Sequence, residues 1–120
     1  MKYQHLIILL ALGIVACSPK QEAKKTVKEF VEASIAANSD YSFNDFGKLD
    51  STRYVTDSAL LIMRSQAEKD AAFKSELKYG RRAVPKEQLK YMNVKMTINE
   101  KDTAYTFYLT NDLKQVVSFK

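Results

Sequence analysis

The last third of the sequence alternates between apolar and polar residues over two stretches, and this pattern constrains the fold more than any other feature. A strand that buries one face shows a period of two, because successive side chains point to opposite sides of the sheet. The apolar positions are Met92, Val94, Met96 and Ile98 in one stretch and Tyr105, Phe107 and Leu109 in the other. A four-residue turn over residues 99–102 would form the opposed pairs Met96–Tyr105, Val94–Phe107 and Met92–Leu109. Because the two apolar sets then share one face, we predict an antiparallel hairpin.

A third strand is predicted at the end of the chain. If the turn after residues 111–112 takes an odd number of residues, Val117 faces Phe107 and Phe119 faces Tyr105. Leu113 is a poor turn residue, so we expect a bulge near it.

Two helices are predicted before these strands. In residues 22–37 the apolar side chains recur at offsets of three and four and form one face, made by Ala23, Val27, Phe30, Val31 and Ile35. For a second helix over residues 57–78, Asp57 suits the N-cap and Gly80 suits the C-terminal stop. Residues 41–50, with three aromatics, are expected to form a loop or short helix that covers the core, or alternatively to line a pocket.

Together these elements predict an α+β fold in which two N-terminal helices pack on a C-terminal three-stranded antiparallel meander. The helices would cover the sheet face made by Met92, Val94, Met96, Phe107, Leu109, Val117 and Phe119. The opposite face would carry the polar positions and remain open to solvent, as antiparallel sheets tolerate.

The N-terminus has the order of an export signal: Lys2, then an apolar run over residues 6–15, then the small residue Ala16 before a cut. The run is too short to span a bilayer, which takes about 20 apolar residues. Ile14-Val15-Ala16-Cys17 resembles the lipobox of bacterial lipoproteins, and Cys17 is the only cysteine. The resemblance implies a signal peptide over residues 1–16, acylation of Cys17 with palmitate-like chains, a tether over residues 17–22 and one domain over residues 23–120. The alternative is a plain secreted protein in which Cys17 is merely the first mature residue.

In this interpretation the chain is exported and anchored by lipid to the cell membrane of the bacterial envelope. In the enteric pattern an Asp after the cysteine argues for inner-membrane retention, and Ser18 in its place favours the outer membrane. The chain carries 19 basic and 14 acidic side chains, and Lys2 leaves with the signal. Acids lie between most of the bases, so we expect no nucleic-acid partner. Lys20, Lys24 and Lys28 share one helix side, which is either an ordinary solvated surface or a contact with anionic lipid headgroups.

Catalytic chemistry is restricted by what the chain lacks. The only histidine, His5, lies within the signal, so the mature chain has no histidine and, once Cys17 is acylated, no free thiol. This excludes Ser-His-Asp and Cys-His catalysis and zinc sites built from His and Cys. Two glycines remain in the mature chain, too few for a glycine-rich phosphate loop. We therefore expect a non-enzymatic protein with no cofactor and no metal site.

The open sheet face is the candidate binding surface. It carries Tyr91, Asn93, Lys95 and Tyr108, and tyrosines on a polar surface suit contact with an envelope protein or a glycan. The alternative is a solvated face with no partner.

Beyond the signal, the chain resembles short uncharacterised lipoproteins of gut-type bacteria, and the layout over residues 23–120 is similar to cystatin-like and nuclear-transport-factor-like cone folds. The resemblance carries no functional residue onto this sequence. The main interpretation is a non-catalytic module that binds a partner. The resemblance adds an alternative, a small-ligand pocket or degenerate cone-fold enzyme that uses Asp45 or Asp50 beside Tyr41. Such a pocket would lie between the first helix and the sheet.

Overall fold

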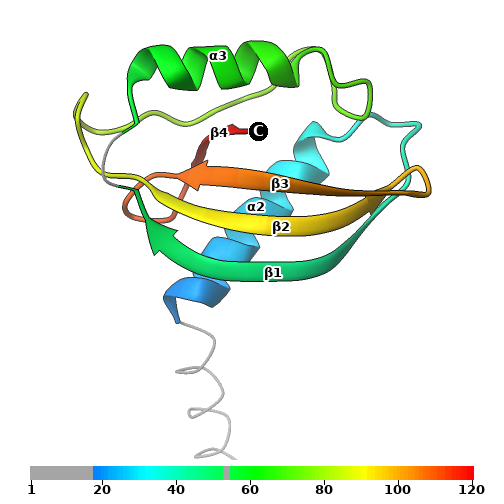
Figure 1. The fold of residues 1–120 in the computed structure, drawn as a ribbon, viewed down its shortest axis with the longest axis horizontal. Helices are drawn as coiled ribbons and strands as arrows, with labels where there is room; N and C mark the ends of the chain where they lie inside the picture. The colour runs from blue at the N-terminus through cyan, green and yellow to red at the C-terminus, as the bar shows by residue number, and fades with distance from the viewer. Residues whose placement is uncertain (1–17, 53–54) are drawn as a thin grey trace, which may run out of the picture.

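The hairpin predicted from the alternating pattern is confirmed, and its strands β2 and β3 form the centre of the sheet (Figure 1). In the computed structural model, which describes residues 18–52 and 55–120, β2 (Lys90–Ile98) and β3 (Lys101–Leu109) are joined by a turn of only two residues. Asn99 and Glu100 both have positive φ, of 50° and 69°. That conformation is typical of the two-residue hairpin turn whose twist matches the flanking strands.

The short turn changes which residues lie opposite each other. Met92 pairs with Phe107 and Val94 with Tyr105, so the predicted register is wrong by two residues. The predicted face is unaffected, because a shift of two returns each side chain to the same side of the sheet.

The sheet has four strands, so the prediction of three is wrong. The additional strand is β1 (Tyr41–Ser51), which pairs antiparallel with β2 and lies at the edge of the order β1-β2-β3-β4. We expected residues 41–50 to be a loop or short helix. Register shifts between Phe43 and Asp45 and between Phe46 and Leu49 break the period of two, which explains why the alternation does not show in the sequence.

The last strand, β4 (Val116–Phe119), pairs with β3 after a turn in which Leu113 has φ 65°. Phe119 lies opposite Phe107, not Tyr105, and Val116 lies opposite Leu109. The register is irregular at Leu109, in agreement with the expected bulge. The irregularity separates the two valines: Val116 joins the core beneath the first helix, whereas Val117, predicted for that core, belongs to the cluster on the other face.

The first helix, α2 (Pro19–Ser34), confirms the predicted amphipathic segment. It begins three residues earlier than expected, with Ser18 as N-cap and Pro19 in the first turn, where a missing N–H carries no penalty. Ala23, Val27 and Val31 are fully buried against the sheet.

The second helix, α3 (Asp57–Ala67), is shorter than predicted. Thr56, not Asp57, is its N-cap, and its hydroxyl accepts a hydrogen bond from the amide of Ala59 at 3.0 Å. After Ala67 the Asp70 carboxylate accepts the amide of Ala72 at 3.0 Å and the hydroxyl of Tyr105 at 2.8 Å. Phe73 is buried in the core. These contacts hold residues 68–73 in turns, so tertiary packing overrides the helical pattern of the sequence.

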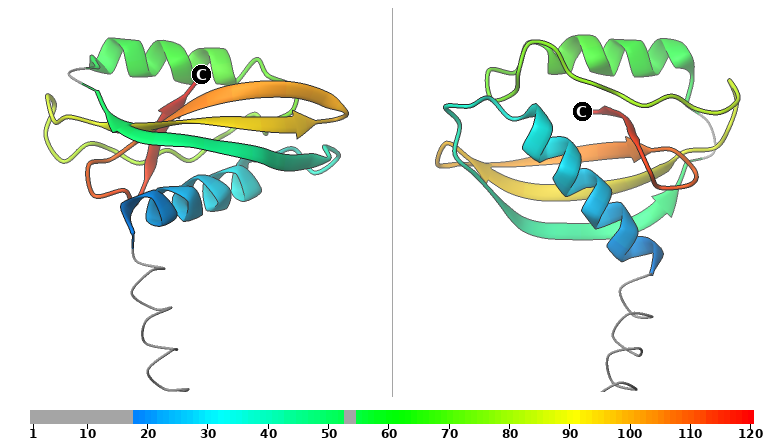
Figure 2. Two further views of the ribbon diagram at one scale, coloured as in Figure 1. Left: turned by 60° about the horizontal axis from the view of Figure 1, so that its bottom comes forward. Right: turned by 180° about the vertical axis from the view of Figure 1, so that it is seen from behind.

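The sheet lies between the two helices, with α2 on one face and α3 on the other (Figure 2). The α2 face holds the main core, in which Phe107 stacks on Phe119 with ring centroids 5.3 Å apart. The α3 face holds a smaller cluster of Leu60, Leu89, Tyr108 and Val117. The expectation that both helices cover one face is therefore wrong, and so is the expectation of an uncovered second face. Tyr108 and Val117 on the second face pack against Leu60 of α3, and this apolar contact stabilises the helix on the sheet.

Candidate functional site

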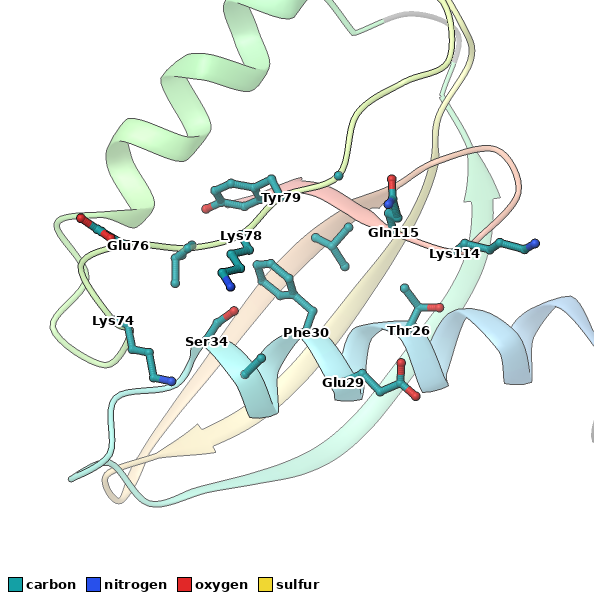
Figure 3. A pocket seen from close by; sticks show the side chains of 14 residues that line it. Thr26, Glu29, Phe30, Ser34, Lys74, Glu76, Lys78, Tyr79, Lys114 and Gln115 are labelled. Carbon is teal, nitrogen blue, oxygen red and sulfur yellow. The ribbon is translucent and has the colours of Figure 1, made fainter.

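A groove of about 620 Å³ lies between α2 and an irregular segment that follows α3 and bends at Ser75 and Glu76 (Figure 3). We call this segment, residues 74–80, the strap, and the groove the strap groove. Phe30 and Ala33 of α2, Leu77 of the strap and Val116 of β4 give the groove an apolar lining. In Figure 3 Phe30 points from α2 toward the strap, and Lys78 points from the strap toward α2.

Hydrogen bonds fix both ends of the strap groove. At one end the hydroxyl of Thr26 donates to the carbonyl of Leu113 at 2.6 Å and ties α2 to the β3–β4 turn. At the other end the amide of Lys74 donates to the carbonyl of Ser34 at 2.8 Å. The amide of Ala36 donates to the carbonyl of Ala72 at 2.9 Å beside it. The two walls are therefore held at a set separation without a ligand.

The wall formed by Tyr79 is packed on both sides. On one side, the centroid of its ring lies 5.6 Å from that of Phe30. On the other side, the guanidinium of Arg64, a residue of α3, lies 4.7 Å from the ring centroid of Tyr79. Arg64 also donates to the carbonyls of Val117, at 2.9 Å, and Gly80, at 3.2 Å. Burial lowers the pKa of Arg64 and raises the pKa of Tyr79 to about 12. The phenol of Tyr79 therefore keeps its proton at neutral pH, and Tyr79 forms part of the groove wall.

The main chain of the strap is largely unpaired within the part of the chain that the structure describes. At one end of the strap the amide of Gly80 donates to the carbonyl of Val116 at 2.8 Å, and at the other end the amide of Lys74 donates to the carbonyl of Ser34. Residues 75–79 between them make no backbone–backbone hydrogen bond. Ser75 and Glu76 lie in a bend, and because alternate residues of an extended chain direct their donors and acceptors to the same edge, a second chain could pair with at most every other one of these residues.

Charged side chains surround this apolar lining. Lys74, Lys78 and Lys114 contribute three amines, and Glu29 and Glu76 contribute two carboxylates. All five residues are exposed. An apolar floor with a polar rim is the composition of a recognition site for a peptide or small amphiphile.

The predicted binding surface on the second sheet face is only partly open. Tyr108 is 8 % exposed beneath α3, and Tyr91 is half-buried with its ring 6.1 Å from that of Tyr108. Asn93 and Lys95 are exposed, and the amide oxygen of Asn93 accepts the hydroxyl of Thr106 at 2.6 Å. The structure therefore brings the two tyrosines together under α3 and leaves Asn93 and Lys95 as the exposed part of the set.

The residues of the alternative pocket do not converge. Asp50 lies nine residues along β1 from Tyr41, which is about 30 Å at about 3.3 Å per strand residue. Asp45 is exposed and pairs in register with Lys95. The space between α2 and the sheet is filled by fully buried side chains that include Met92, Met96 and Phe107.

Cys17, the predicted lipidation site, lies outside the described residues. Within residues 18–52 and 55–120, no three His, Cys, Asp or Glu side chains gather in a way that could hold a metal ion. In the same ranges no helix has the length and apolar character needed to cross a bilayer.

Sequence reasoning did not find the strap groove. It placed residues 74–78 on a helix, which would have paired their backbone and directed their side chains differently. The sequence does single out Phe30, a large aromatic on the predicted apolar helix face, but its partners Tyr79 and Val116 are distant in sequence.

Comparison with family models, with characterised proteins and with solved structures finds no match to this chain. The candidate function therefore depends on the chain's own residues and geometry.

Proposed function

We propose that this chain is an exported lipoprotein, anchored to the bacterial cell envelope through acylated Cys17, and that its folded domain is a non-catalytic module that binds an extended segment of a partner protein in the strap groove. The observation that carries the binding proposal is the unpaired main chain of residues 75–79 beside an apolar groove with fixed ends. An extended peptide gains main-chain hydrogen bonds from the strap and places alternate side chains on the apolar lining.

The anchor is supported by the sequence alone. Lys2, the apolar run over residues 6–15 and a lone cysteine directly after Ala16 form the lipoprotein signal pattern. Two or more acyl chains hold a protein on a membrane stably, since each buried CH₂ contributes about 0.8 kcal/mol. The outer membrane is the proposed location where the cell has one.

Two measurements test the anchor. Intact mass of the protein purified from its host is expected to show acyl groups at Cys17, and a free thiol would refute the proposal. Cys17→Ala is expected to move the protein out of the membrane fraction, so full membrane recovery of that variant would also contradict the anchor.

The groove is tested by crosslinking in the native envelope followed by mass spectrometry. Lys74, Lys78 and Lys114 supply amines at the groove for an amine-reactive crosslinker. Ala33→Arg places a large side chain in the groove from an exposed helix position and is expected to abolish those crosslinks. The matched control is Ala71→Arg, an exposed position outside the groove, which is expected to retain them. If both variants keep the same crosslinks, the groove is not the binding site.

A further inference from the structure

The side of α2 that faces β1 carries a series of lysines. Lys24 and Lys28 point toward β1, where their amines lie 5.0 and 5.4 Å from the ring centroid of Phe46. Glu29 lies on the opposite side and lines the strap groove. Because residues four apart lie on the same side of a helix, Lys20 belongs with Lys24 and Lys28. We call these three residues the lysine flank.

A row of aromatic rings continues the lysine flank along the edge strand. Tyr41, Phe43 and Phe46 are all half-buried. The ring of Tyr41 lies 5.8 Å from that of Phe43, which stacks on Phe46 at 5.2 Å. Half-exposed aromatics beside lysines are the composition of protein surfaces that lie at a membrane–water interface. We call these three residues the aromatic row.

Acidic residues are also present near this surface. Asp45 and Asp50 are exposed on β1, and Glu32 is exposed one turn after Lys28. Asp45 lies opposite Lys95 on the neighbouring strand, and Asp50 accepts a hydrogen bond from the amide of Ser51 at 2.8 Å. None of these carboxylates makes an ion pair with a lysine of the flank within the described residues.

The flank begins close to the proposed anchor along the chain. Only Ser18 separates Cys17 from the first residue of α2. The first turn of α2 and the edge strand β1 lie on the same side of the molecule, and α3 lies on the opposite side (Figure 1). A bilayer that holds Cys17 therefore lies next to the lysine flank and the aromatic row, and far from α3.

We infer that the lysine flank and the aromatic row dock on the surface of an anionic lipid bilayer and hold the domain in one orientation, with α3 facing away from the membrane. The lysine amines lie at the anionic headgroups, where each basic residue is attracted to the surface potential. Phe43 and Phe46 pack against the main core with one part of each ring, and the exposed part meets the interface below the amines. This inference rests on the lipid anchor proposed above. The tether was predicted over residues 17–22, but α2 begins at Pro19, so only Ser18 lies between Cys17 and the helix. This short connection keeps the lysine flank and the aromatic row within reach of the headgroups.

The chain has no tryptophan, so a single introduced tryptophan reports on one position without background. Phe46→Trp places the reporter in the aromatic row, with Phe43→Trp as a second reporter if the first destabilises the fold. Ile62→Trp is the matched control, because Ile62 is 58 % exposed and apolar but lies on α3. The full-length lipoprotein is purified from membranes and reconstituted in vesicles of brominated phosphatidylcholine with or without phosphatidylglycerol.

Bromine quenches tryptophan only within a short distance, so quenching reports contact with the bilayer. We expect the emission of the Phe46→Trp variant to lose intensity in vesicles that contain phosphatidylglycerol, and the loss to diminish at high salt. Adding Lys24→Gln and Lys28→Gln to this variant is expected to remove the quenching. Adding Lys74→Gln and Lys78→Gln instead, the same charge change at the strap groove, is expected to leave it. The Ile62→Trp control is expected to remain unquenched.

Equal quenching of the Phe46→Trp and Ile62→Trp variants, or none in either, would overturn the inference, because the domain would then have no preferred orientation. Equal effects of the two lysine pairs would overturn the role of the flank. Intact mass of the same sample separates the two proposals. If Cys17 is acylated but the tryptophan in the aromatic row is not quenched, the docking surface is refuted and the anchor is not. If Cys17 carries a free thiol but the tryptophan is quenched, the anchor is refuted and the docking surface is not.

Discussion

The position of Gly47 in β1 allows a direct test of the strand that the sequence did not reveal. Gly47 has no positive φ, so an alanine fits its backbone conformation. A Cβ placed there would lie 2.9 Å from the backbone carbonyl oxygen of Asn93 on β2. Side-chain carbons essentially never approach an oxygen so closely, and a backbone oxygen cannot rotate away. Gly47→Ala must therefore push β1 away from β2.

The magnitude follows from two opposing effects. Inserting a methyl group into a well-packed contact costs about 1–3 kcal/mol. Replacing glycine by alanine also restricts the unfolded chain, which offsets about 0.4–1 kcal/mol. The expected net loss in the free energy of unfolding is about 1–2 kcal/mol. At about 4–8 °C per kcal/mol for a domain of this size, the melting temperature falls by roughly 5–15 °C.

Thermal and urea unfolding monitored by circular dichroism measure this loss. Ser42→Ala is the control, because Ser42 is exposed on the same strand and is expected to change stability by less than about 0.5 kcal/mol. If Gly47→Ala is as stable as the parent protein or more stable, β1 does not pack against β2 at this point and the reasoning fails.

Three further predictions concern one buried and two half-buried aromatic residues. Phe107→Ala removes a fully buried ring from the α2 face and is expected to cost about 3–5 kcal/mol in urea unfolding; a loss under about 1 kcal/mol would contradict the described core. Tyr105→Phe removes the hydroxyl that donates to Asp70 at 2.8 Å and is expected to cost about 1 kcal/mol, measured by thermal unfolding, with no loss if that hydrogen bond does not form. Burial raises the pKa of Tyr79 from 10 to about 12 and also raises the pKa of Tyr105. As pH rises, the unfolded chain therefore loses these two protons before the folded protein does. The free energy of unfolding is expected to fall as pH rises from about 10 to 12. Unfolding measured across this range is expected to show a smaller decline for Tyr79→Phe, and an equal decline would show that Tyr79 is not buried as described.

Sequence reasoning succeeded where the pattern is local. The hairpin faces follow from the period of two in β2 and β3, and the buried side of α2 follows from offsets of three and four. It failed where a contact between distant residues decides the conformation. The two bulges of β1 are formed by pairing with β2, and the end of α3 is set by Asp70 and Phe73 through contacts with Tyr105 and the core.

The candidate site shows the same division. Phe30 is recognisable from its helix position, but the strap groove exists only because α3 ends at Ala67 and residues 74–80 lie beside α2 without helical structure. The aromatic row likewise depends on β1, since in a loop the same residues would not form an ordered series of rings beside the lysine flank.

The amino-acid sequence by itself determined the α+β composition, the buried faces of α2 and the hairpin, and the absence of histidine chemistry beyond position 5, because each depends on residue type and near-neighbour spacing. Only the tertiary structure decided that the sheet has four strands, that the two helices lie on opposite faces, and that the strap leaves an open groove. The physical reason is that edge pairing, helix termination and the course of the strap are fixed by contacts between residues far apart in the chain, whose energies outweigh local preference.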